Sequence, residues 1–208
     1  MMKIALVSLL SMVAVAPAMA TVTISSVDGS APYGAPATFQ FDSATPEYSG
    51  TIYYDSVGSL RAQPAGSTGG YGAVGPGDAE ASAVLDLSSF GPIQSISFLW
   101  GSIDDFNTLD VLGTSAVFHG GDADLNPANG DQVAPGSNRL VTLTFSGDDI
   151  FNVTGLRFSA TGNAFEFDNV NVTPAAVPEP ASWALMLGGF ALTGMALRGS
   201  RRSVTRTA

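Results

Sequence analysis

The chain contains no cysteine, and this absence excludes several kinds of site and scaffold. Disulfide frameworks, thiol catalysis and cysteine-ligated zinc sites all require the missing residue. His119 is the only histidine, so a Ser-His-Asp arrangement would have to use it. It precedes Gly120 and Gly121 at the end of an expected strand, which indicates an exposed loop histidine. We therefore expect a protein that is not an enzyme, and a secreted hydrolase is the remote alternative.

Basic residues are almost missing from the middle of the chain. Between residues 21 and 177 the basic side chains are Arg61, Arg139 and Arg157, against 17 acidic residues, so the formal charge of this segment is −14. A surface this acidic repels nucleic acid and anionic lipid. The composition therefore excludes a nucleic-acid partner and favours cations or neutral partners such as polysaccharides.

Long hydrophobic runs are confined to the two ends, and the first has the three parts of a secretory signal peptide. Lys3 supplies the positive charge, residues 4–16 form the apolar region, and Ala18 and Ala20 form a small-residue cleavage site. We expect export and cleavage after Ala20, which removes residues 1–20. The alternative, a membrane anchor, requires a longer apolar run.

The second run, residues 181–197, is uninterrupted by charge and has the minimum length of a transmembrane helix. Trp183 lies at one edge and a basic tail, residues 198–208, follows the other. This arrangement predicts a single span with the preceding domain outside the cytoplasm. The alternative is a buried C-terminal helix of a soluble domain.

A proline-rich linker, residues 174–180, leads into this run and completes a recognisable pattern. The residues that carry it are Pro178, Glu179, Pro180, Trp183, Ala184, Gly189, Phe190, Gly194, Arg198, Arg201 and Arg202. Residues 178–202 resemble the PEP-CTERM sorting signal of exported bacterial proteins, in its PEPxxWA form. One departure is Gly199-Ser200, which interrupts the basic cluster.

The resemblance implies both a processing enzyme and a path of export. In that family the tripeptide is the proposed recognition site of an exosortase, a membrane transpeptidase, and the proteins are associated with exopolysaccharide or biofilm matrix. It implies an intermediate held in the bacterial inner membrane by its C-terminal helix, and then a protein at the cell surface or outside the cell.

The segment 21–173 predicts an all-β domain, an antiparallel β-sandwich or jelly roll. Short β-branched or alternating runs are separated by Gly, Asn and Asp turn signals. The expected strands are 22–25, 37–41, 51–54, 82–87, 93–100, 108–111, 115–119, 140–145, 153–159 and 164–172. The run 140–145 is apolar at nearly every position, so we expect an interior strand. Residues 63–77 are rich in Gly, Pro and Ala and predict a long surface loop, and Asp168-Asn169 predicts a β-bulge.

Two groups of oxygen-bearing side chains are candidates for structural calcium. Asp122, Asp124 and Asn126 alternate as in an EF-hand, but Pro127 and Val133 stand where that loop needs Gly and Glu. An irregular calcium site and a solvated turn loop both remain open.

The second group follows from a weak resemblance of the last strand, residues 165–172, to galactose-binding-like jelly rolls. That resemblance implies calcium between Asp168 and an N-terminal carboxylate, Asp28 or Asp42. The alternative is that Asp168 satisfies backbone groups at the bulge.

A carbohydrate-binding module is the alternative function. Trp100 or Tyr71 could stack on a sugar while Asp104 bonds its hydroxyls. The competing interpretation is a core tryptophan beside an acidic turn.

Overall fold

The computed structural model describes residues 19–29, 37–125, 127–176 and 180–202, and these belong to two compact units that divide between Pro174 and Ala175. The first unit is all-β. Its strands are β1 (Thr21–Asp28), β2 (Ile52–Tyr53), β3 (Tyr71–Val74), β4 (Ser82–Asp86), β5 (Ile93–Gly101), β6 (Asn107–Leu112), β7 (Val117–His119), β8 (Arg139–Ser146), β9 (Gly155–Ala160) and β10 (Phe165–Pro174). Short helices join some of them: η1 (Ser88–Phe90), η2 (Ala123–Leu125) and α1 (Asp149–Asn152).

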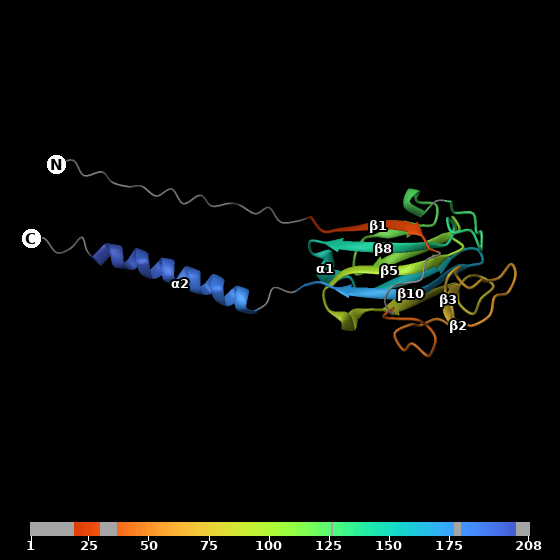
Figure 1. Ribbon diagram of the computed structural model, residues 1–208, viewed down its shortest axis with the longest axis horizontal. Helices are drawn as coiled ribbons and strands as arrows, with labels where there is room; N and C mark the ends of the chain where they lie inside the picture. The colour runs from red at the N-terminus through yellow and green to blue at the C-terminus, as the bar shows by residue number, and fades with distance from the viewer. Residues whose placement is uncertain (1–18, 30–36, 126, 177–179, 203–208) are drawn as a thin grey trace, which may run out of the picture. The chain divides into compact units, whose positions relative to one another are not determined.

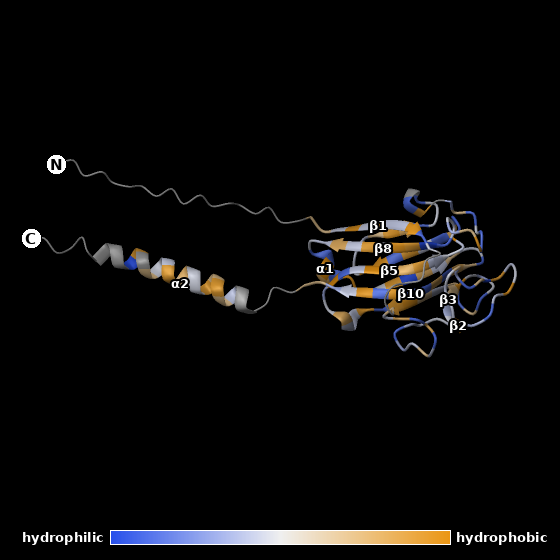
Figure 2. Cartoon of the chain, viewed as in Figure 1, coloured by the Kyte–Doolittle hydropathy of each residue, from blue (hydrophilic) through white to orange (hydrophobic). Residues whose placement is uncertain are grey.

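The strands form two antiparallel sheets that pack as a sandwich. The larger has the order β1-β8-β5-β10-β3-β2 (Figure 1). The smaller has the order β4-β9-β6-β7. Apolar and polar residues alternate along the strands, as expected where one face of a sheet is buried (Figure 2). The predicted two-sheet sandwich is thus confirmed, whereas the strand orders do not establish the predicted jelly-roll arrangement.

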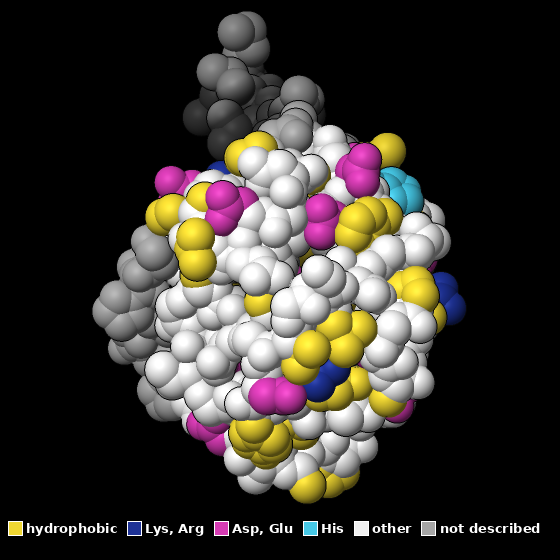
Figure 3. Space-filling model, turned by 90° about the vertical axis from the view of Figure 1, so that its right-hand side faces the viewer, with side chains coloured by type: hydrophobic (Ala, Val, Ile, Leu, Met, Phe, Trp, Pro, Cys, Tyr) yellow, Lys and Arg dark blue, Asp and Glu magenta, His cyan; other side chains and the backbone are white. Residues whose placement is uncertain are grey.

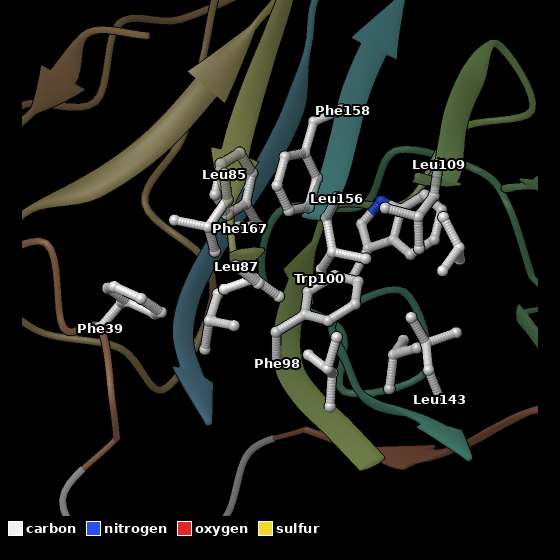
Figure 4. Packing of buried hydrophobic residues seen from close by; sticks show 14 of the residues in the cluster. Phe39, Leu85, Leu87, Phe98, Trp100, Leu109, Leu143, Leu156, Phe158 and Phe167 are labelled. Carbon is white, nitrogen blue, oxygen red and sulfur yellow. The ribbon is translucent and has the colours of Figure 1, made fainter. Parts of the chain in front are cut away.

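Aromatic side chains pack among aliphatic ones in the core between the sheets (Figure 4). Phe158 of β9 stacks on Phe167 of β10 with ring centroids 3.6 Å apart, and Trp100 of β5 stacks on Phe165 with centroids 4.1 Å apart. All four side chains are fully buried. Burial of each such ring contributes about 1.5–3 kcal/mol to folding, and the Phe158–Phe167 stack joins the two sheets.

Two predictions about strands are confirmed in detail. β8 lies between β1 and β5, as the apolar run 140–145 indicated. The β5–β10 register shifts between Asp168 and Asn171, which is the expected bulge. Asn169 takes a left-handed conformation there, with φ of 53°, which asparagine tolerates better than most residues.

Two other predictions about strands are wrong. The expected strand 37–41 makes a single bridge, between Phe39 and Val170, and is otherwise irregular. The expected loop 63–77 contains β3, which pairs with both β10 and β2. Gly72 lies in β3 because the ring of Phe167 fills the space that a side chain would take. The small residues that indicated a loop therefore permit close packing within a sheet.

The second unit contains one long helix, α2 (Pro180–Arg202), which begins at a proline, a residue favoured in the first helical position. The Thr193 hydroxyl bonds back to the Gly189 carbonyl. Across the described residues, we find no helix with both the length and the apolar character needed to cross a membrane. The expected helix is therefore confirmed, and its membrane span stays a prediction.

Candidate functional site

The residues proposed to contact sugar are mostly inside the domain, which corrects that prediction. Trp100 and Tyr71 are both fully buried. The Trp100 indole N–H donates to Asn107 Oδ1 at 3.3 Å, and the Tyr71 hydroxyl donates to the Asp55 carbonyl at 2.6 Å. Neither ring can stack on a ligand, so the interpretation of Trp100 as a core residue is the right one.

Asp104 is the only one of the three with access to solvent, and it is half-buried. Burial, followed by the neighbouring charge of Asp105, raises its carboxyl pKa to about 6. Its backbone N–H donates to the buried Asn107 Oδ1 at 3.0 Å, so the turn is fixed from inside the domain. Asn107, which follows the acidic turn in the sequence, is buried and bonds both Trp100 and this turn.

The first calcium candidate is an ordinary turn where the structure describes it. Asp122 Oδ2 accepts the His119 backbone N–H at 2.8 Å, and Asp124 is exposed in η2. Asn126 lies outside the described residues. His119 is exposed at the end of β7, as expected, and its imidazole contacts the Thr108 hydroxyl instead of a carboxylate.

In the second calcium candidate, Asp42 lies near enough to Asp168 for its charge to raise the Asp168 pKa, after the larger effect of burial, whereas Asp28 makes a separate contact. Asp168 is fully buried and accepts the Asn169 backbone N–H at 2.7 Å, the role expected at a bulge. Asp28 pairs with Arg139 at 3.2 Å, while Asp42 accepts the Gly70 N–H at 3.0 Å. Among the described residues, no three His, Asp or Glu side chains come together as metal ligands. Calcium therefore stays a prediction without structural support.

A buried carboxylate that sequence reasoning missed lies on the outer face of β10. We call residues 55–70, which cover this face, the strap. Glu166 Oε1 accepts the strap's Ala62 N–H at 2.9 Å, and Oε2 accepts the Ser102 hydroxyl at 2.6 Å. Burial raises the Glu166 pKa to about 8, although both hydrogen bonds act in the opposite direction. The strict alternation of residues 165–168 predicts that Glu166 faces away from the core, but no pattern reveals that the strap covers it.

A cleft of about 440 Å³ lies where residues 37–47 pass from one sheet to the other. Phe39 bridges to Val170 of β10, and Tyr48 bridges to Leu85 of β4. The described lining combines uncharged polar side chains with two carboxylates, includes the half-buried ring of Phe90 and contains no basic side chain. Acidic side chains are scattered over the end of the domain seen in Figure 3.

The sorting residues belong to the second unit. Pro180 begins α2, Trp183 and Arg198 are exposed on it, and Arg201 and Arg202 are its last residues. Pro178 and Glu179 lie outside the described part of the chain, as does Ala18, whereas Ala20 directly precedes β1.

Comparison with protein families identifies this segment. Residues 176–202 match the family described as the PEP-CTERM protein-sorting motif. The chain carries a PEP-CTERM motif. Such a motif implies export, processing by an exosortase and a surface or extracellular destination. Neither the curated proteins nor the solved structures give a match to the chain.

Proposed function

We propose that this is a non-enzymatic surface or matrix protein whose β-sandwich is delivered by its PEP-CTERM motif. The match over residues 176–202 carries the proposal. The order of the chain supports it: a signal-like N-terminus, a domain with its own core, and a sorting segment that begins within two residues of the domain's end. An association with biofilm or exopolysaccharide follows from the resemblance and belongs to the same proposal.

The proposed absence of catalysis rests on how the candidate groups are used. His119 contacts Thr108, and the nearby Asp122 accepts a backbone N–H and does not orient the imidazole. Glu166, whose carboxyl pKa lies far above its ordinary value, is 1% exposed beneath the strap and out of reach of a substrate. These groups stabilise the fold in the arrangement observed.

The experiment compares processing of wild type with Glu179→Ala in cells that export the protein. We expect the variant to keep a larger mass and to remain in the membrane fraction, because the motif presents Glu179 to the exosortase. Glu47→Ala, an exposed change within the domain, is the matched control and should be processed normally. An identical mature mass and location for Glu179→Ala would refute a role in processing.

The cleft favours a second candidate function, binding of a neutral saccharide. Its volume lies within the roughly 300–1,000 Å³ of ligand pockets, and its described lining offers an aromatic ring and hydrogen-bonding groups while its carboxylates disfavour anions. Titration with neutral glucan and galactan oligosaccharides tests it. Gln40→Ala, an exposed change, should weaken binding, and Gln94→Ala, exposed on β5 and outside the cleft lining, should not. Failure of wild type to bind any of these sugars would exclude the candidate.

A further inference from the structure

Within the described residues the two sheets end in four edge strands, and three of them are protected against pairing with another chain. Edge strands present unpaired backbone N–H and C=O groups, which proteins usually shorten or cover. β2 has two residues and β7 has three. β4 is covered by residues 47–49: the Ser49 N–H donates to the Val84 carbonyl at 2.9 Å and the Asp86 N–H to the Glu47 carbonyl at 2.8 Å.

β1 is the exception. It is eight residues long and follows β8 in unbroken register, from Thr21 opposite Ser146 to Asp28 opposite Arg139, at the rim of the larger sheet (Figure 1). It contains no proline, lysine or bulge. η2 contacts β1, and the Ser26 hydroxyl donates to the Asp124 carbonyl. No backbone group of the described residues pairs with the outer edge of Thr21–Ser25.

Charge sets this rim apart from the rest of the domain. Residues 21–27 have no charged side chain, although the segment 21–177 has a formal charge of −14. The positions beside them on β8 are also uncharged, with Thr23 opposite Thr144 and Ser25 opposite Thr142. The one carboxylate of β1, on Asp28, is paired with Arg139. Two copies can therefore meet along this edge without bringing carboxylates together.

We propose that β1 pairs with β1 of a second copy, antiparallel and centred on Thr23, so that the two larger sheets become one. Residues directly opposite each other on antiparallel strands lie on the same face of the sheet. A one-residue shift in register would therefore place core-facing side chains of one copy beside solvent-facing side chains of the other. Centring on Thr23 meets this condition: Val22 lies opposite Ile24 of the second copy, and Thr21 opposite its Ser25. Val22 and Ile24 are half-buried at the rim of the core, so pairing completes their burial. The contact is two-fold and self-complementary.

The mass of the protein purified from exporting cells, measured by light scattering across concentration and salt, tests this proposal. We expect a dimer that strengthens with salt, because screening weakens repulsion between two acidic domains while backbone pairing is unaffected. Amide hydrogens of β1 should exchange more slowly as concentration rises. A monomer at every concentration and salt level would overturn the proposal.

Two lysine variants locate the contact. Thr23→Lys places like charges face to face at the two-fold axis and should weaken dimerisation up to about fivefold. Thr144→Lys introduces the same charge on the same face, one strand inward, and should leave the dimer intact. An equal loss of dimerisation in both variants would indicate that the copies associate through the faces of their sheets. Stoichiometric co-purification of a different polypeptide on β1 would assign the edge to that partner. Either result contradicts the proposal.

Discussion

Glu166 lies among described neighbours that leave room for a carboxyl group but supply no cation. It pairs across the sheet with Ala73 and Gly101, two of the smallest residues, and Pro64 of the strap lies over Gly101. A side chain at Gly101 would overlap Pro64, since a Cβ there would lie 2.8 Å from the proline Cβ. The strap thus closes over Glu166 and removes water, which is why the pKa of this carboxyl rises despite two hydrogen bonds.

This burial predicts a fall in stability as pH rises. The Glu166 pKa is about 8 in the folded protein against an ordinary 4.5, so between these values the folded state holds a proton that the unfolded state has lost. The stability this proton confers is complete below the ordinary pKa and is lost as pH rises through the folded pKa. Asp168, whose pKa burial raises to about 7, acts in the same direction.

The variant Glu166→Gln tests the origin of this dependence. Its amide keeps an acceptor for the Ala62 N–H and a donor for the Ser102 oxygen, without a charge. Thermal unfolding followed from pH 5 to 9 should show a flatter profile than wild type and a higher melting temperature at the alkaline end. Glu47→Gln, an exposed substitution, is the control and should keep the wild-type profile. An unchanged slope in Glu166→Gln would assign the pH dependence to other groups.

At the scale of elements, the sequence predicts nine of the ten strands that the structure describes and fails where glycine and alanine form one. The alternating runs work because one face of each sheet is buried and the other is polar. β3 escapes this pattern because both of its faces are covered, one by the core and the other by the strap, so all four of its residues are buried. Composition alone cannot separate such a strand from a flexible loop.

β3 also provides a test of close packing. Gly72→Ala should destabilise the domain by about 1–3 kcal/mol, because a Cβ would lie 2.8 Å from Cε1 and Cε2 of the Phe167 ring. Gly58→Ala is the matched control, since nothing lies within 4 Å of its added methyl group, and it should change stability little. Denaturant unfolding measures both. Equal effects would show that the ring of Phe167 moves aside.

Some functional residues can be predicted from the sequence and others cannot, depending on whether they act within one short segment. The sorting motif is local, so Pro178 to Arg202 are recognised from their spacing, and the family comparison agrees. The prediction for Trp100 and Tyr71 is wrong because an aromatic residue beside polar neighbours looks the same whether its ring faces solvent or the core. The cleft and the burial of Glu166 arise from contacts between distant segments, which no short pattern records.

At the scale of the whole molecule, the division into two units predicts that the sandwich folds without its sorting segment. A chain that ends at Pro174 should keep the melting temperature of the full-length protein, because its core is complete within the first unit. A chain that ends at Asn163 lacks β10 and should not fold cooperatively. Circular dichroism of both truncated proteins measures this, and a large loss of stability in the longer one would show that the domain depends on residues 175–208.

The place of β10 has a consequence for the timing of export. This last strand joins β5 to β3, so until residues 165–174 are available the larger sheet exists as two separate pieces. The matched sorting segment starts at residue 176, immediately behind it. A chain that is exported N-terminus first therefore completes its domain at almost the same moment as its sorting motif becomes accessible. A chain truncated before residue 165 lacks both its final strand and the sorting signal.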